Sequence, residues 1–213
     1  MVATYRNTAL LFTVILVFVL VAFFKTYFSL FPDFKDTSLA VHIHVAIVLL
    51  WFAMLIAQPI LIGTKRLKLH RLVGKVSYVL VPLVIITGAL MIRQEQMREK
   101  NLIVFTANII DLSIFVLLFA LAIIYKRKTA WHSRFMILTV LPFIGAPAAR
   151  LQVNGLFIEL SILLILLIIE RFNAKIYKPY LLGLLVFFML YISFFGLLIW
   201  KPEVLDSLWK VFF

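Results

Sequence analysis

Residues 102–125 read LIVFTANIIDLSIFVLLFALAIIY, and Asp111 is their single charged residue. A membrane-crossing α-helix needs about 20 mostly apolar residues, so this run predicts a transmembrane helix. At the usual rise of a helix, Asp111 would lie about 15 Å below the outer end. An ionisable side chain at such a depth is costly in lipid, which makes Asp111 a candidate functional residue.

Six further stretches have the same length and apolar character, and together with the first they predict seven spans. The predicted spans are Ala9–Phe31, Leu39–Ile62, Leu69–Ile92, Leu102–Tyr125, Trp131–Ala149, Leu156–Phe172 and Pro179–Trp200. Pro142 and Pro147 interrupt the fifth span, and the sixth is short. The predicted fold is all-α, a single domain of residues 1–213 that forms a bundle of about seven transmembrane helices.

The composition agrees with a membrane protein. Of the 213 residues, 65% are hydrophobic and 14% are charged, whereas a soluble domain is about half apolar and about a quarter charged. A chain of this length cannot bury the excess, because much of its surface stays outside. These values exclude a soluble enzyme, a secreted disulfide scaffold and a disordered protein. The absence of cysteine also excludes disulfides, thiolate nucleophiles and iron–sulfur clusters.

The basic residues are distributed unevenly between the two ends of the predicted spans. Thirteen of the 21 lie on the side that holds the N-terminus, where Glu170 is the only acid: Arg6, Lys65, Arg66, Lys68, Arg71, Lys75, Lys126, Arg127, Lys128, Arg134, Arg171, Lys175 and Lys178. The positive-inside rule makes this side cytoplasmic. The N-terminus is therefore predicted inside and the C-terminus outside. The net charge of +12 then reflects topology and implies no nucleic-acid partner.

The segment 202–213 differs from the spans because apolar and charged residues are mixed in it. Val204 and Leu205 stand among Glu203, Asp206 and Lys210. Such a pattern is typical of a short amphipathic helix that lies in the membrane interface. We expect this tail at the outer surface of the bilayer.

All four histidines lie near span ends, and two of them begin stripes along a helix face. At about 100° per residue, the stripes are His70, Gly74, Ser77, Val81 and Gly88 in the third span, and His132, Met136, Thr139, Phe143 and Arg150 in the fifth. A histidine followed by glycine suits a haem, because imidazole binds the iron and the missing side chain leaves room for the porphyrin.

The haem hypothesis assigns a role to each residue of this inner site. His70 and His132 would be the axial ligands of a haem b, with Gly74 beside the porphyrin and Arg71 or Arg134 near its propionates. Two other readings remain open. The glycines can serve close helix packing, and histidines beside arginines can bind lipid phosphates.

A second polar site is predicted in the outer half of the bundle. Asn108 and Asp111 are three residues apart and share a helix face. His42 and His44 are two apart and point about 200° away from each other, so only one of them can face a given partner. Arg150 could pair with Glu159 or meet an anionic group. A zinc site that joins all four histidines is not expected, because His42 and His44 lie about a bilayer thickness from the other two.

Several of these motifs together resemble a known family. They are His42-x-His44, Trp51, Gln58-Pro59, Lys68-Leu69-His70-Arg71-Leu72-Val73-Gly74-Lys75, Trp131-His132-Ser133-Arg134-Phe135-Met136 and Arg150. Over roughly residues 20–155, they resemble a bacterial family of small multi-pass membrane proteins of unknown function, most closely members from Bacteroidetes. This resemblance implies a membrane fold, in the inner membrane of a bacterium, and no established activity.

A more distant likeness is to the di-haem transmembrane cytochrome b proteins, in which four successive helices carry axial histidines and pair alternately. His70 and His132 fit one such pair. The other pair is broken, because the fourth span has Asn108 near the depth where that family has a histidine. The likeness therefore implies at most one haem.

Two functions from different classes follow. The first is a b-type haem protein that carries electrons, with a quinone or a redox membrane protein as its partner in the bilayer. The second is a non-enzymatic transporter, lipid-binding protein or assembly factor with its site near Asp111 and Arg150. Signatures of hydrolases, zinc proteases and nucleotide-binding enzymes are absent from the sequence.

Overall fold

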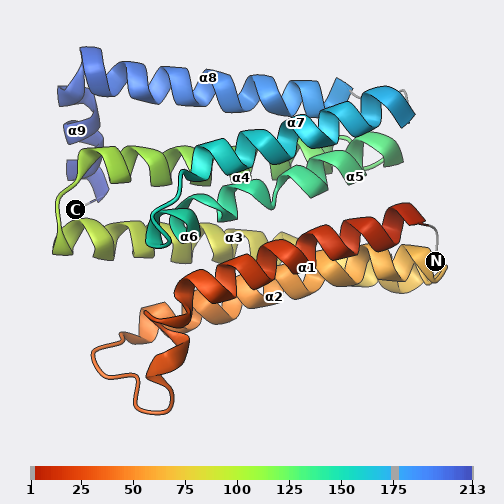
Figure 1. Ribbon diagram of the computed structural model, residues 1–213, viewed down its shortest axis with the longest axis horizontal. Coiled ribbons are helices and arrows are strands. Elements are labelled where there is room, and N and C mark those ends of the chain that lie inside the picture. Colours follow the sequence, from red (N-terminus) through yellow and green to blue (C-terminus); the bar gives the residue numbers. More distant parts are fainter. Residues whose placement is uncertain (1–2, 174–177, 213) are drawn as a thin grey trace. The chain divides into compact units, whose positions relative to one another are not determined.

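The computed structural model describes residues 3–173 and 178–212, and Lys175 and Phe213 lie outside the described residues. The secondary structure of the described residues is helical, with no strand among them (Figure 1), which confirms the all-α prediction. The elements are α1 (Ala3–Phe24), η1 (Phe28–Leu30), α2 (Leu39–Gly63), α3 (Leu67–Arg98), α4 (Leu102–Ile124), α5 (Thr129–Leu138), η2 (Leu141–Phe143), α6 (Gly145–Arg150), α7 (Gly155–Asn173), α8 (Lys178–Trp200) and α9 (Pro202–Phe212).

Five of the described helices are long and apolar enough to cross a membrane, namely α1, α2, α3, α4 and α8. Many of their apolar side chains are exposed on the protein surface, such as Leu10, Val79 and Met189. Apolar side chains in such number have a favourable environment only in lipid. The chain is therefore a multi-pass membrane protein whose surroundings are a lipid bilayer.

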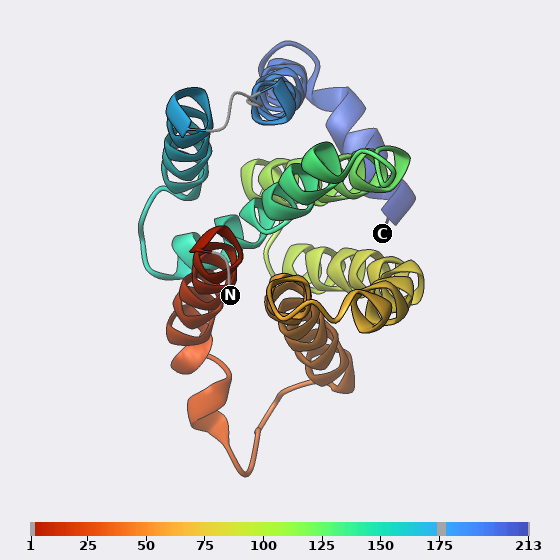
Figure 2. The same ribbon diagram turned by 90° about the vertical axis from the view of Figure 1, so that its right-hand side faces the viewer.

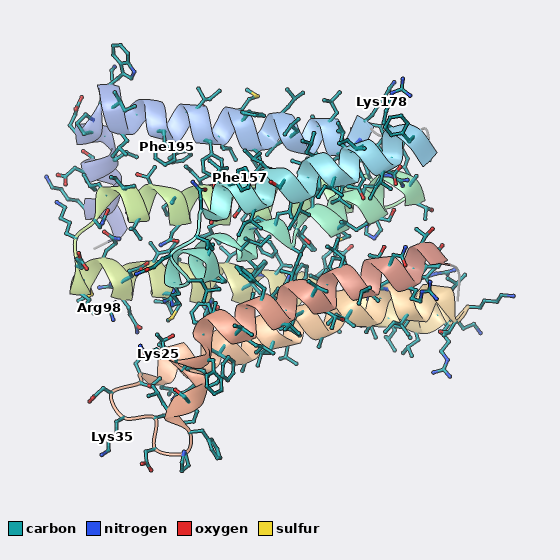
Figure 3. The ribbon with its side chains drawn as sticks, viewed as in Figure 1. Lys25, Lys35, Arg98, Phe157, Lys178 and Phe195 are labelled. Carbon is teal, nitrogen blue, oxygen red and sulfur yellow. The ribbon has the colours of Figure 1, made fainter. Side chains whose placement is uncertain are left out.

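The chain divides into two compact units, Met1–Met91 and Ile92–Phe213, and α3 begins in the first and ends in the second. In the first unit α1 packs along α2. The segment between them contains η1 and turns back toward α2 (Figure 2). Lys25 and Lys35 lie in this segment (Figure 3).

The second unit is built around α4, which packs against α5 and α8, while α7 packs against α6 and α8. The predicted fifth span is not one helix, which is a correction to the sequence analysis. It consists of α5, η2 and α6. Pro142 lies in the first turn of η2 and Pro147 lies within α6; neither residue has an N–H to continue an α-helical ladder. The predicted stripe from His132 to Arg150 therefore does not lie on a single helix.

The tail forms the predicted helix, α9, and is held to the second unit by polar contacts. Asp206 accepts a hydrogen bond of 2.7 Å from Nζ of Lys100, in the turn between α3 and α4. It also forms an ion pair of 3.4 Å with Lys210, one turn further along α9. Leu205 is fully buried. The placement of α9 in the membrane interface stays a prediction.

Candidate functional site

Asp111 lies nine residues into α4, which corresponds to a depth of about 14 Å along the helix. Its side chain is buried, with 9% of the residue exposed. Tyr191 of α8 donates a hydrogen bond from its hydroxyl to Oδ1 of Asp111, over 3.2 Å. The residue that the sequence marks as costly in lipid therefore has a partner on another helix of the same unit.

Glu159 of α7 contacts the same hydroxyl. Its Oε2 lies 3.5 Å from the Tyr191 hydroxyl oxygen, and the residue is fully buried. Its other oxygen, Oε1, is also buried, and the backbone N–H of Gly145 at the start of α6 interacts with the carboxyl group. The carboxyl groups of Asp111 and Glu159 are thus linked through one tyrosine hydroxyl. We call Asp111, Glu159 and Tyr191 the Asp111 layer.

Two glycines allow the close approach that brings these carboxyl groups together. A Cβ atom on Gly145, at the start of α6, would overlap the carboxyl group of Asp111. A Cβ atom on Gly155, at the start of α7, would lie 2.9 Å from the Cα atom of Gly145, closer than such atoms normally come. Glu159 is four residues after Gly155, one turn along α7. The backbones of α6 and α7 therefore meet at glycine, which places Glu159 beside Asp111.

The hydrogen bonding of the Asp111 layer favours one proton shared by two carboxyl groups. A tyrosine hydroxyl has a single proton to donate, so Tyr191 can serve only one carboxylate at a time. The second carboxyl group can bond to the hydroxyl oxygen when it carries a proton itself. Two ionised carboxylates side by side would also repel each other strongly in a buried, apolar setting. The arrangement can therefore bind and release a proton.

Asn108 and Arg150, which the sequence analysis groups with Asp111, each have a hydrogen-bond partner other than Asp111. Nδ2 of Asn108 donates to Oε2 of Glu95 over 2.8 Å. Nη1 of Arg150 donates to the carbonyl oxygen of Ala146 over 3.2 Å. The charged-type side chain that the structure brings to Asp111, through Tyr191, is Glu159.

The structure also places His42 and His44, which lie in the first unit and point to different partners. Nδ1 of His42 is 2.7 Å from the hydroxyl of Tyr27. Nδ1 of His44 is 3.1 Å from Oγ1 of Thr87, on α3. The Thr87 hydroxyl also lies 2.8 Å from the carbonyl oxygen of Leu83, so it connects His44 to the backbone of α3. The histidine that faces α3 is therefore His44.

His70 and Gly74 lie near the start of α3 and belong to the first unit. Further along their stripe Ser77 and Val81 are buried, at 4% and 3% exposed, as expected for a packed face. A Cβ atom on Gly74 would be 3.8 Å from Nε2 of Gln58 on α2. The side chain beside Gly74 is therefore a glutamine amide. Arg71 is exposed.

His132 and Arg134 lie on α5, in the second unit. Nδ1 of His132 is 2.8 Å from the carbonyl oxygen of Ala122, and since a carbonyl oxygen can only accept, Nδ1 donates this hydrogen bond. Arg134 forms an ion pair of 2.7 Å with Glu170 of α7 and donates to the carbonyl of Ala130. Because His70 belongs to the other unit, the haem hypothesis stays a prediction.

The sequence analysis did not identify Tyr191 or Gly145, and it considered Glu159 only as a possible partner of Arg150. Tyr191 stands in an apolar run, where an aromatic residue normally means packing. The signal in the sequence was the polar hydroxyl of Tyr191 within an apolar span, because a buried tyrosine hydroxyl requires a hydrogen-bond partner. Within the described ranges no group of three or more His, Cys, Asp or Glu side chains is placed to hold a metal ion.

No protein-family model, no curated protein and no solved structure matches this chain. The resemblances noted from the sequence therefore stay expectations.

Proposed function

We propose that the protein is a non-enzymatic membrane transporter that binds and releases a proton at Asp111 and Glu159. The observation that carries this proposal is the linkage of two buried carboxyl groups through the single hydroxyl of Tyr191. Buried carboxyl groups within membrane helices are typical of proton pathways.

A proton fits this site better than a metal cation does. Calcium takes six to eight oxygen ligands, and magnesium requires about six in an octahedron. The Asp111 layer offers two carboxyl groups and one hydroxyl, and Glu159 is fully enclosed by protein. A proton needs only one acceptor and no cavity. We therefore assign the proton as the bound species.

Seven crossings of the membrane form part of the proposal, with the broken fifth segment and α7 added to the five long helices. Irregular backbone at membrane depth is tolerated where protein covers it. Thr139, Val140 and Leu141, at the break between α5 and η2, are all fully buried. On α7 the acidic residue Glu159 is buried while Phe157 is 71% exposed and labelled in Figure 3. Polar residues inside and apolar residues outside are the pattern of a helix in lipid.

The proposed orientation has the N-terminus in the cytoplasm of a bacterium, across its inner membrane. The chain contains no cysteine, so a single introduced cysteine reports its side without background. We expect a membrane-impermeant maleimide to label Lys35→Cys in intact cells with the outer membrane opened. Arg127→Cys should react only after the inner membrane is permeabilised. The opposite pattern would reverse the orientation.

The infrared spectrum of the purified protein tests the proton site directly. At neutral pH we expect one C=O stretching band from a protonated carboxyl group, and a shift of this band in D₂O. The band should disappear in the double variant Asp111→Asn/Glu159→Gln, because both possible carriers of the proton are then amides. Glu203→Gln, which changes an exposed carboxyl group of α9, is the matched control and should leave the band unchanged. A wild-type spectrum without the band, or a band that persists in the double variant, would refute the proposal.

A further inference from the structure

The helices α7 and α8 each repeat the same type of side chain after eleven residues. Glu159 and Glu170 are eleven apart on α7, and Tyr180 and Tyr191 are eleven apart on α8. Eleven residues make about three turns of a helix, a rise of about 16 Å with an angular offset of only about 20°. Glu170 therefore lies on the same face of α7 as Glu159, and Tyr180 lies on the same face of α8 as Tyr191. Both are about three helical turns away from the Asp111 layer.

These repeated residues form a second polar layer with an arginine of α5. Arg134 and Glu170 are joined by an ion pair of 2.7 Å, and their side chains are only 14% and 15% exposed. Tyr180 is buried, at 2% exposed, and is within electrostatic reach of both charges. We call Arg134, Glu170 and Tyr180 the Arg134 layer. It lies at the end that the charge distribution predicts to be cytoplasmic.

Three apolar side chains lie between the two polar layers, one on each of the helices α5, α7 and α8. Leu163 is four residues after Glu159 and seven before Glu170; Phe187 is seven after Tyr180 and four before Tyr191. On α5, Leu138 is four residues after Arg134. Spacings of four and seven keep a residue on the same helix face.

All three of these side chains, Leu138, Leu163 and Phe187, are fully buried. Leu138 reaches α8, because a Cβ atom on Gly183 would overlap its Cδ1. The ring of Phe187 is stacked with that of Tyr191, with centroids 6.5 Å apart. We call Leu138, Leu163 and Phe187 the apolar layer. Such a layer excludes water, and without water a proton cannot pass between the two polar layers.

We propose that the Arg134 layer is a second proton-exchange site, and that the apolar layer is the gate between it and the Asp111 layer. This inference rests on the proposed function of the Asp111 layer. When water enters the gate, the shared proton leaves the Asp111 layer as a hydrated proton and bonds to the carboxylate of Glu170. The Asp111 layer then gains one negative charge and Glu170 becomes neutral, which breaks its ion pair with Arg134. Loss of the proton to the cytoplasm restores the pair.

Opening the gate by mutation should create a proton leak. The protein is reconstituted into liposomes that contain a pH-sensitive dye, and proton entry is driven by a potassium diffusion potential. We expect Phe187→Ala to raise proton entry at least tenfold over wild type, because the lost ring admits water between the layers. Phe188→Ala removes the same side chain from the neighbouring, exposed position and should not raise it.

A combined variant tests whether the leak passes through the Arg134 layer. Adding Arg134→Gln/Glu170→Gln to Phe187→Ala should abolish the leak, since two amides can keep the contact between the helices but cannot take up the proton. If Phe187→Ala does not fold, Leu163→Ala replaces it as the gate variant. No leak beyond that of Phe188→Ala, or a leak that survives the two amides, would overturn the inference. The infrared band separates the two proposals: if the band is present and the leak is absent, only the gate is refuted.

Discussion

Arg134→Met is expected to destabilise the protein by about 3–5 kcal/mol, the usual cost of removing one partner from a buried ion pair. The substitution leaves the carboxylate of Glu170 in a site where its side chain is only 15% exposed. The hydroxyl of Tyr180, which is itself buried, lies within electrostatic reach of this carboxylate. A single hydroxyl cannot replace the charge and the hydrogen bonds of a guanidinium group. Thermal unfolding of the purified protein in detergent measures the effect as a lower Tm.

The double variant Arg134→Met/Glu170→Leu distinguishes a lost attraction from a stranded charge. Replacing both partners of a buried pair by apolar residues of similar volume is often neutral or stabilising. We therefore expect the double variant to recover most of the Tm that Arg134→Met loses. If the double variant is as unstable as the single one, packing by the arginine stem, and not the buried charge of Glu170, sets the stability.

The length and hydropathy of the long spans predict most of the fold. The predicted Leu39–Ile62 and Leu102–Tyr125 differ from α2 and α4 by one residue at one end. These boundaries were predictable because a helix in lipid must keep its backbone hydrogen bonds inside the segment, so the apolar run and the helix coincide. The third span was less well predicted: it ends at Ile92 by hydropathy, whereas α3 continues to Arg98. A helix that leaves the lipid can continue in water, and hydropathy does not register this.

The candidate site was only partly predictable, because it depends on contacts between helices. Asp111 was identified because a carboxyl group within an apolar run is rare. Its partner was not, because Glu159 is close to polar loop residues in the sequence and its burial follows from the contact between Gly145 and Gly155. Glycine contributes little to a hydropathy profile, but here its lack of a side chain decides which helices come into contact. Tyr191 was missed because one hydroxyl changes the apolar character of a span very little.

Gly155→Ala is expected to lower stability by about 1–3 kcal/mol, the usual range for overpacking a tight contact. The added Cβ atom would lie 2.9 Å from the Cα atom of Gly145 and 3.2 Å from the Cβ atom of Ala148. Neither atom can rotate away, because one belongs to the backbone and the other is bonded directly to it. The helices α6 and α7 must therefore separate. Thermal unfolding in detergent should show a lower Tm than that of wild type.

Gly196→Ala is the matched control, because a Cβ atom there would meet nothing within 4 Å. It lies inside α8, where alanine is favoured over glycine by up to about 1 kcal/mol, so its Tm should be equal to or above that of wild type. Gly155→Ala should also alter the infrared band of the protonated carboxyl group, since Glu159 follows Gly155 by one turn and would move away from Tyr191. Equal Tm values for the two alanine variants, with an unchanged band in both, would show that the glycine contact does not position the proton site.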